Sequence, residues 1–307
     1  MADPSEGSAG PTRCGYVAIL GAPNVGKSTL LNRLVGTKVS IVSPKVQTTR
    51  TRVLGIAMAG QSQVIFIDTP GIFAPKRRLE RAMVHAAWSG AADADIVLLV
   101  VDAARKSVTE DTHRIIEGLR GAGRKAILVL NKIDLVKREK LLGLAAELNA
   151  SGIFTDVFMV SAETGDGVDD LMAALAARMP EGPWLFPEDQ VSDMPMRLIA
   201  AEVTREHLFR QLHDELPYAI AVETESWEEF KDGSIKINQI VYVQRDGQKA
   251  IVLGQGGRRI KAIREAAQFE LEAMLGRKVH LFLYVKVRED WPEDRERYRD
   301  LGLEYDV

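Results

Sequence analysis

Residues 21–28 form a glycine-bearing motif whose residue types suit the binding of a phosphate group. Their sequence, GAPNVGKS, fits the pattern G-x-x-x-x-G-K-[ST] and follows an apolar run typical of a strand. The glycines allow backbone N–H groups to surround a phosphate, Lys27 would reach the β- and γ-phosphates, and the Ser28 hydroxyl would bind Mg²⁺. The residues predicted to bind nucleotide here are Gly21, Ala22, Pro23, Asn24, Val25, Gly26, Lys27, Ser28 and Thr29.

Residues 131–134, with the sequence NKID, distinguish guanine from adenine. The Asp134 carboxylate can accept hydrogen bonds from the N1–H and the exocyclic amine of guanine, a donor pair that adenine lacks. Asn131 would brace the loop, and the stem of Lys132 would cover the base. A loop after the next apolar run would complete the base pocket with backbone N–H groups. That loop contains Ser161, Ala162 and Glu163.

Two segments between these motifs would complete the metal and γ-phosphate site. The first is Asp68, Thr69, Pro70 and Gly71, which ends an apolar run. Asp68 would hold Mg²⁺ through water, and the Gly71 N–H would face the γ-phosphate. In the second segment, residues 40–52, a threonine would bind Mg²⁺ only while the γ-phosphate is present, and Thr49 is favoured over Thr48 for this role. The predicted metal ligands are therefore Ser28, Thr49 and, through water, Asp68, and the catalytic candidates are Lys27, Thr49 and Gly71.

Residues 254–257, with the sequence GQGG, form a second glycine-bearing turn between a short apolar helix and a basic helix. This layout resembles the KH RNA-binding module, in which glycines let the backbone of four single-stranded nucleotides approach closely. The basic residue that such loops usually carry between the glycines is replaced here by Gln255 and Gly256, which leaves a backbone clamp and flanking cations. The residues predicted to bind RNA are Gly254, Gln255, Gly256, Gly257, Arg258, Arg259, Lys261 and Arg264.

The nucleotide motifs lie in a region where strand-like and helix-like segments alternate. Strands are predicted at residues 16–20, 64–68, 96–102, 126–130 and 157–160, and helices at 27–35, 109–119, 139–149 and 168–179. This alternation predicts an α/β fold, a mostly parallel sheet with helices on both faces. Residues 52–58 are a further candidate strand, which would pair with 64–68 through a turn at 59–62.

A different order of elements follows a segment at 180–195 that holds four prolines. Helices are predicted at 196–216, 248–253 and 258–275, and strands at 218–225, 234–245 and 279–287, which together make a compact α+β domain of the KH type. The chain is therefore divided into a mobile tail (1–13), a GTP-binding domain (14–180), a linker (181–195) and an RNA-binding domain (196–307).

The composition is that of a globular protein without strong overall charge. The 307 residues include 40 Lys and Arg against 43 Asp and Glu, a net charge of −3. This balance excludes indiscriminate nucleic-acid binding, but residues 245–278 hold eight basic and four acidic residues around the GQGG turn. One cysteine fits a reducing compartment, and the N-terminal residues lack the basic start and apolar core of a signal peptide.

The five nucleotide motifs, GAPNVGKS, QTTR, DTPG, NKID and SAE, resemble in this order those of translation-factor-class GTPases. The residues around QTTR, SIVSPKVQTTR at 40–50, and the order of the two domains are most similar to the Era family. The resemblance implies a GTPase that uses Mg²⁺, binds single-stranded ribosomal RNA near the 3′ end of the small-subunit rRNA, and acts in small-subunit assembly. It implies a cytoplasmic protein without an obligate protein partner, and leaves open a peripheral contact with the inner face of the membrane.

The resemblance also bears on how water is activated. Small signalling GTPases place a water-orienting glutamine after the glycine of DTPG, and here Ile72 stands there, which implies slow intrinsic hydrolysis. Asn24 is the residue that in related proteins helps hold a monovalent cation, so we add it to the catalytic candidates and hypothesise that K⁺ accelerates hydrolysis. The alternative is that Asn24 only shapes the loop.

Two other functions fit parts of the sequence. One is a non-catalytic RNA-binding factor that senses guanine nucleotide, which multiple-turnover hydrolysis would distinguish. The other is a GTPase that acts on transfer RNA or at a membrane, which crosslinking to cellular RNA would distinguish.

Overall fold

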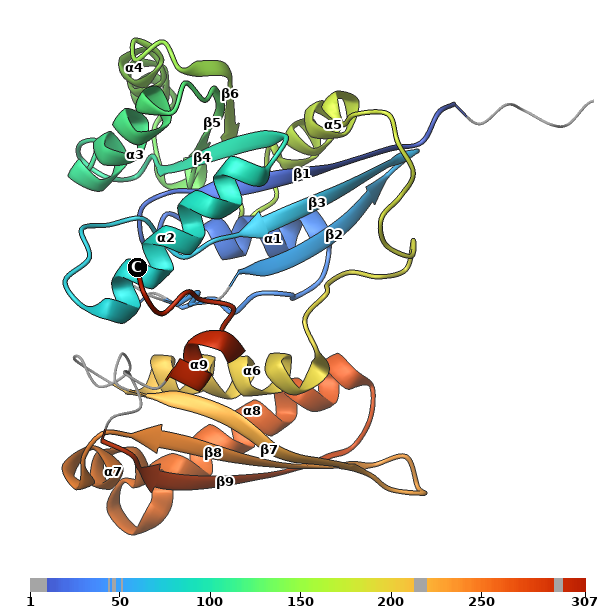
Figure 1. Ribbon diagram of the computed structural model, residues 1–307, viewed down its shortest axis with the longest axis vertical. Coiled ribbons are helices and arrows are strands. Elements are labelled where there is room, and N and C mark those ends of the chain that lie inside the picture. The colour runs from blue at the N-terminus through green and yellow to red at the C-terminus, as the bar shows by residue number, and fades with distance from the viewer. Residues whose placement is uncertain (1–9, 44, 46–47, 51, 213–219, 290–294) are drawn as a thin grey trace, which may run out of the picture. The chain divides into compact units, whose positions relative to one another are not determined.

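The computed structural model describes residues 10–43, 45, 48–50, 52–212, 220–289 and 295–307. The chain forms two compact units, which Figure 1 shows as two groups of helices around two sheets. The first unit contains Met1–Val39, Arg52–Ala74 and Ala87–Asp193, and the second contains Ser40–Thr51, Pro75–Ala86 and Met194–Val307. Two segments from the predicted GTP-binding domain thus group with the second unit. The functional boundaries after residues 13, 180 and 195 stay predictions, and most of the predicted tail lies outside the described residues.

The first unit is built on a six-stranded sheet in the order β2-β3-β1-β4-β5-β6. Neighbouring strands run parallel except β2, which pairs antiparallel with β3 through the predicted turn. Central strands such as β4 are buried on both faces, as their continuous apolar runs predict. The strands are β1 (Arg13–Leu20), β2 (Val53–Ala59), β3 (Ser62–Asp68), β4 (Ile96–Asp102), β5 (Ala126–Asn131) and β6 (Phe154–Val160).

Four α-helices lie between strands of this sheet in the described part of the chain, and a fifth follows β6. They are α1 (Lys27–Val35), α2 (Arg78–Asp93), α3 (Glu110–Gly121), α4 (Arg138–Asn149) and α5 (Val168–Arg178). Helix α2 is not among the predicted helices, because its apolar face is made largely of alanine rather than of large aliphatic residues. At Gly90 in α2, a Cβ would lie 3.4 Å from Cγ2 of Ile67 in β3, which is van der Waals contact distance. The helix thus approaches the sheet closely at a point where the sequence shows only small residues.

The proline-containing segment after α5 is held against the first unit by hydrogen bonds. The buried Gln63 side chain in β3 accepts from the backbone N–H groups of Leu185 and Phe186 at 2.9 and 3.0 Å and donates to the Phe186 carbonyl at 2.8 Å. Further along, Ile56 N–H in β2 donates to the Val191 carbonyl at 2.9 Å. The predicted linker therefore follows the edge of the sheet.

The second unit contains a three-stranded sheet, β7 (Ala221–Glu229), β8 (Ile235–Val243) and β9 (Val279–Val287), in that order. Helices α6 (Met196–Gln211) and α8 (Arg258–Leu275) pack on the sheet through a buried core that includes Val203, Ile237 and Leu271. The short helices are α7 (Asp246–Leu253) and α9 (Arg295–Asp300). This α+β arrangement confirms the predicted fold class.

Strand β7 ends four residues later than the sequence suggests. The predicted strand stops at Glu225, whereas β7 continues to Glu229. A register shift between Thr224 and Ser226 interrupts the two-residue alternation there, so the residues after it look like a charged turn. Among the described residues, no helix is both long and apolar enough to cross a membrane.

Candidate functional site

The P-loop, residues 21–28, joins β1 to α1 in a conformation that requires glycine at one point. Gly26 has a φ of 97°, and a Cβ at this position would overlap the side-chain amide nitrogen of Asn131. The Lys27 side chain turns back over the loop, and its Nζ donates to the carbonyl oxygens of Gly21 and Ala22, both at 3.2 Å. The loop is therefore closed by its own lysine at the start of a helix, where anions bind favourably.

The ammonium group of Lys27 is buried, and this changes its acidity. Burial lowers the pKa of Lys27 to about 8, while the negative charge of Asp68 acts in the opposite direction. A phosphate beside Nζ would stabilise the charged lysine and raise its pKa again. The group is therefore tuned to gain charge when an anion binds.

Ser28 and Asp68, the two predicted metal ligands of the first unit, lie in direct contact. The Ser28 hydroxyl donates to Oδ2 of Asp68 at 2.7 Å, and the Asp68 side chain is fully buried at the end of β3. A hydroxyl and a carboxylate oxygen are the ligands that Mg²⁺ prefers, so these residues fit the predicted metal. The next residue, Thr69, is fixed by its hydroxyl, which donates to the Ile19 carbonyl at 2.9 Å.

Gly71 and Ile72 hold the end of the DTPG segment close to the P-loop. The Ile72 N–H donates to the Gly21 carbonyl at 3.2 Å, and a Cβ on Gly71 would lie 3.0 Å from the backbone of Pro23. The Ile72 side chain is fully buried. A buried aliphatic side chain cannot orient a water molecule, and slow intrinsic hydrolysis stays a prediction.

Asn131 connects three loops of the predicted nucleotide site. Its Nδ2 donates to the Val25 carbonyl in the P-loop at 2.9 Å, and its Oδ1 accepts from the Ala162 N–H at 3.0 Å. Both bonds are buried, and the side chain is 1% exposed. Asn131 therefore braces the P-loop against the loop that carries residues 161–163, as the sequence predicts.

Lys132 adds a second connection, which involves a residue that the sequence analysis missed. Lys132 and Asn24 are the two non-glycine residues with positive φ in the described parts of the chain, at 67° and 64°. Nζ of Lys132 donates to the Asn24 carbonyl at 2.9 Å and lies 2.8 Å from Oδ2 of Asp102. Asp102 is the last residue of β4 and lies at the carboxyl end of a central strand, where ligands of such folds bind. This position in the sequence could have marked Asp102 as a candidate site residue.

The two loops predicted to bind guanine differ in how far their residues are exposed to solvent. Asp134 is exposed, whereas Ser161 and Ala162 are buried. Arg33, at the end of α1, donates from Nε to the Ala162 carbonyl at 3.2 Å and from Nη2 to the Glu163 carbonyl. Arg33 is a second positioning residue that the motifs do not reveal, because it lies in a helix whose amphipathic pattern explains it as a surface residue.

Thr49 belongs to the other compact unit, so its predicted role as a metal ligand stays a prediction. It is 7% exposed, and both of its neighbours are anchored in the second unit. The Thr48 carbonyl accepts from Nη2 of Arg205, and Nη1 of Arg50 donates to the Ile220 carbonyl at 2.7 Å.

The GxxG loop, residues 254–257, joins α7 to α8 through three glycines with positive φ. The φ angles of Gly254, Gly256 and Gly257 are 71°, 59° and 76°. A Cβ on Gly254 would lie 2.7 Å from Cβ of Arg259, whereas nothing lies within 4 Å of the position of a Cβ on Gly256 or Gly257. The outer half of the loop therefore presents bare backbone.

The cations that follow the loop already make some contacts with groups of α7 and α8. Nη1 of Arg259 donates to the Ile251 carbonyl at 2.6 Å, and Nη1 of Arg264 donates to Oε1 of Gln268 at 2.9 Å. Nζ of Lys261 lies 3.9 Å from Glu265, with 71% of the Lys261 side chain exposed. Together with the exposed Arg258, they place positive charge beside the open backbone of the loop.

Two family models match the two parts of the chain. The model described as a 50S ribosome-binding GTPase matches residues 16–132, and the model described as a KH domain matches residues 215–292. The first covers the P-loop, DTPG and the start of NKID, and the second covers the GxxG loop.

Proteins named GTPase Era are similar to the chain over nearly its full length. The one from Sinorhizobium medicae is 58% identical over 96% of this chain and 95% of its own, and the one from Caulobacter vibrioides is 53% identical over 96% and 98%. Solved structures agree. Aquifex aeolicus Era bound to GDP·AlF₄⁻ matches with a TM-score of 0.89. Era in complex with MgGDPNP and nucleotides 1506–1542 of 16S ribosomal RNA matches with a TM-score of 0.90. Each is 39% identical to this chain, and each match covers 96% of this chain and all of the other. The chain belongs to the Era family of GTPases.

Proposed function

We propose that this protein binds and hydrolyses Mg²⁺·GTP at the P-loop site and binds small-subunit ribosomal RNA near its 3′ end through the GxxG loop, in assembly of the small ribosomal subunit. The observation that carries this proposal is the pair of sites on one chain, which shares its fold over 96% of its length with an Era that was solved with MgGDPNP and a 16S rRNA fragment. This function belongs in the cytoplasm, where ribosomes assemble.

In the hydrolytic reaction, water attacks the γ-phosphorus of GTP. The bond from this phosphorus to the β–γ bridging oxygen breaks, which gives GDP and inorganic phosphate. Lys27 would stabilise the charge that develops on the β- and γ-phosphate oxygens, together with the backbone N–H groups of the P-loop and Gly71. Ser28 and, through water, Asp68 would hold Mg²⁺, which when bound neutralises charge on the same oxygens, and Thr49 would join them. Because Ile72 contributes no side-chain amide to orient water, we expect slow turnover in the free protein.

Base recognition would rest on Asp134, and the loops that carry it are braced in advance. Asn131 and Lys132 connect the NKID segment to the P-loop through the Val25 and Asn24 carbonyls. This supports a guanine site that is positioned before the nucleotide arrives, so that little binding energy is spent on ordering it.

RNA would approach the exposed backbone of Gly256 and Gly257, with Arg258 and Lys261 beside its phosphates. Positive charge is concentrated around the loop rather than over the whole unit, which supports a short single-stranded site. We therefore expect a shallow salt dependence, with a slope of about −0.7 for each phosphate contact. A slope equivalent to ten or more contacts would contradict this site.

Two assays on the full chain test the proposal. Multiple-turnover GTP hydrolysis should be measurable in the wild type and about 10²–10³-fold slower in Lys27→Ala. The RNA oligonucleotide that corresponds to the 3′ end of the small-subunit rRNA should bind both proteins equally well. GTP binding without turnover in the wild type would instead support a nucleotide-sensing RNA-binding factor.

We further propose that K⁺ near Asn24 accelerates hydrolysis. The Asn24 carbonyl is held by Lys132, and its positive φ fixes its orientation within the P-loop. Wild-type turnover should be faster in K⁺ than in Na⁺ buffer, and Asn24→Ala should remove this difference. Equal turnover of the wild type in both buffers would overturn the proposal.

A further inference from the structure

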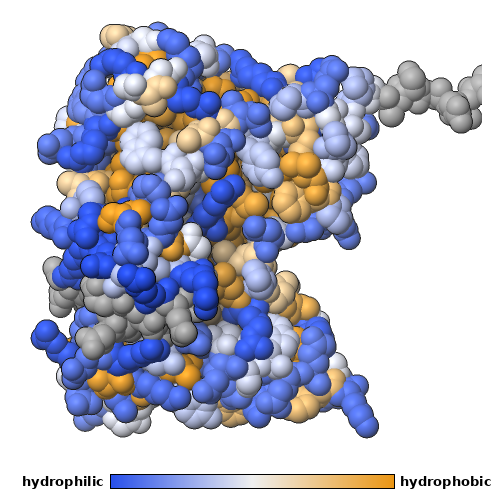
Figure 2. Space-filling view, viewed as in Figure 1, coloured by the Kyte–Doolittle hydropathy of each residue, from blue (hydrophilic) through white to orange (hydrophobic). Residues whose placement is uncertain are grey.

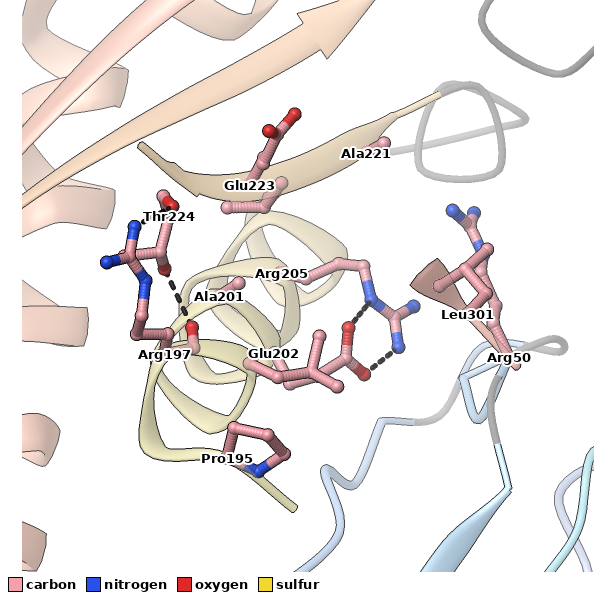
Figure 3. A pocket seen from close by; sticks show the side chains of 12 residues that line it. Arg50, Pro195, Arg197, Ala201, Glu202, Arg205, Ala221, Glu223, Thr224 and Leu301 are labelled. Carbon is pink, nitrogen blue, oxygen red and sulfur yellow. Dashed lines mark hydrogen bonds and ion pairs between the residues drawn. The ribbon is translucent and has the colours of Figure 1, made fainter. Parts of the chain in front are cut away.

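A pocket of about 290 Å³ lies in the second unit between α6 and β7 (Figure 3). Apolar side chains form much of its lining, among them Leu198, Ala201, Val222 and Leu301. A volume of this size accommodates a small organic molecule rather than a nucleotide or a peptide. None of the residues predicted to bind GTP or RNA lines it.

The buried Arg205 side chain supplies this pocket with a hydrogen-bond donor. Its Nε donates to Oε1 of Glu202 at 2.7 Å, and its Nη2 donates to the other Glu202 oxygen and to the Thr48 carbonyl. Its Nη1 is buried and finds no acceptor among the described residues, although the side chain is only 2% exposed. Figure 3 shows the third guanidinium nitrogen directed away from Glu202, on the side of Arg50 and Leu301. A buried cationic donor without an acceptor is costly, and an acceptor on a ligand would remove that cost.

The charges around the pocket favour an anion. Its lining contains Arg50, Arg197 and Arg205 against Glu202 and Glu223, an excess of one positive charge. The guanidinium of Arg197 donates to the carbonyls of Thr224 and Glu225 at 3.0 and 2.9 Å, so it forms part of the wall.

Two of these cations share one aromatic ring. The guanidinium carbons of Arg50 and Arg205 lie 5.6 and 5.1 Å from the centre of the fully buried Phe209 ring. Two like charges at the same buried ring repel each other, and a single negative charge between them would relieve the repulsion.

We propose that this pocket binds a small organic monoanion, with a compact apolar body against Leu198 and Val222 and one carboxylate on Nη1 of Arg205. A cation is disfavoured by the arginines, and a dianion by Glu202 and Glu223. Arg205 donates a hydrogen bond to the Thr48 carbonyl, and Arg50 lines the pocket. The ligand would therefore contact Arg50 directly and Thr48 through Arg205, and these are the two neighbours of Thr49 in the chain. The proposal concerns binding alone and depends on neither GTP hydrolysis nor RNA recognition.

Naphthalene-2-carboxylate and its neutral isostere naphthalene-2-carboxamide are suitable probes, because they have nearly the same shape and differ in charge and in one oxygen that an NH₂ group replaces. The full chain, saturated with GDP and Mg²⁺, is titrated with each by ligand-observed NMR. We expect saturable binding of the acid at one site, about tenfold tighter than the amide because a charge-assisted hydrogen bond replaces a neutral one. Equal affinities, or no binding of the acid, would overturn the proposal.

Three variants locate the site. Arg205→Met should bind the acid and the amide with about the same affinity, since the cationic donor is gone. Ala221→Phe, which fills the pocket from β7, should abolish binding of both probes. Lys231→Met removes a positive charge from an exposed turn outside the pocket and should change nothing. If Arg205→Met does not fold, unchanged acid binding in Ala221→Phe would still refute the site.

Discussion

The P-loop and the GxxG loop are both glycine-bearing turns that lead into a helix, but their surroundings differ. At Gly26 in the P-loop, a Cβ would overlap the Asn131 amide, and Lys27 is buried against backbone carbonyls. At Gly256 in the GxxG loop, nothing lies within 4 Å of a Cβ position. Glycine is therefore required at position 26 by packing as well as by φ, and at position 256 by φ alone.

This difference suggests two ways of preparing a site for phosphate. The P-loop is braced by other loops before a nucleotide arrives, so its geometry is set by the protein. The GxxG loop leaves backbone uncovered, so the RNA itself would provide the missing contacts. Substitutions should therefore damage the first site through lost geometry and the second through obstruction, which gives four predictions in order of decreasing effect.

The largest effect is expected for Lys27→Ala. Removal of a buried cation from the phosphate site should lower the rate of GTP turnover by about 10²–10³-fold. Binding of the 3′ rRNA oligonucleotide should stay within about twofold, because the substitution alters none of the residues predicted to bind RNA. Steady-state hydrolysis measures the turnover rate, and fluorescence anisotropy measures the RNA affinity. A comparable loss of RNA affinity would show that the two sites are not separate.

Gly26→Ala and Gly256→Ala compare the two loops directly. Alanine at a positive φ costs about 1 kcal/mol in itself, so we expect that loss of stability at Gly256, and about 3 kcal/mol at Gly26, where the new methyl group also displaces Asn131. Denaturant unfolding measures the free energies, and GDP titration should show weakened binding for Gly26→Ala alone. Equal losses of stability would contradict the proposed difference in packing.

Gly256→Asp tests obstruction of the open loop. An aspartate tolerates positive φ better than most residues, yet it places a side chain and a negative charge where RNA backbone would approach. RNA affinity should fall by about tenfold or more, with GTP turnover unchanged. Gly233→Asp is the matched control, since Gly233 also has positive φ, at 83°, and open space around it. An equal loss in both variants would remove the assignment of the GxxG loop.

The smallest effect concerns the proton on Lys27. Because burial lowers its pKa to about 8, roughly half of the free protein lacks this proton at pH 8. A bound phosphate raises the pKa, so on GDP binding Lys27 should contribute an uptake of about half a proton at pH 8 and close to none at pH 6.5. Calorimetry in buffers of different ionisation enthalpy measures this number. The uptake at pH 8 should be absent in Lys27→Met, and its persistence there would assign it to another group.

The sequence predicts the elements that carry the motifs better than the contacts between them. Helices α1 and α8 and strands β4 and β9 have the predicted bounds, because periodicity and glycine punctuation mark them clearly. The brace from Arg33 is not predictable, since it joins residues 129 apart in the chain, whereas the position of Asp102 at the end of a strand marks it as a candidate without revealing its partner. Helix α2 and the end of β7 are missed for local reasons, an alanine-rich face and a register shift.

The same limit applies to the segment that carries Thr49. Its motif marks it as part of the nucleotide site, yet its backbone is anchored to residues of the second unit, such as Arg205 on α6. Only the fold reveals such an anchor, because Thr48 and Arg205 lie 157 residues apart in the chain.

The central claim is that the GxxG loop delivers this GTPase to the 3′ end of small-subunit rRNA. Crosslinking of the full chain to RNA in cells, followed by sequencing of the bound fragments, tests it most directly. We predict reads concentrated at that 3′ end, strongly reduced for Gly256→Asp and retained for Gly233→Asp. Reads distributed over transfer RNA or other transcripts, or a pattern that Gly256→Asp leaves unchanged, would contradict the claim.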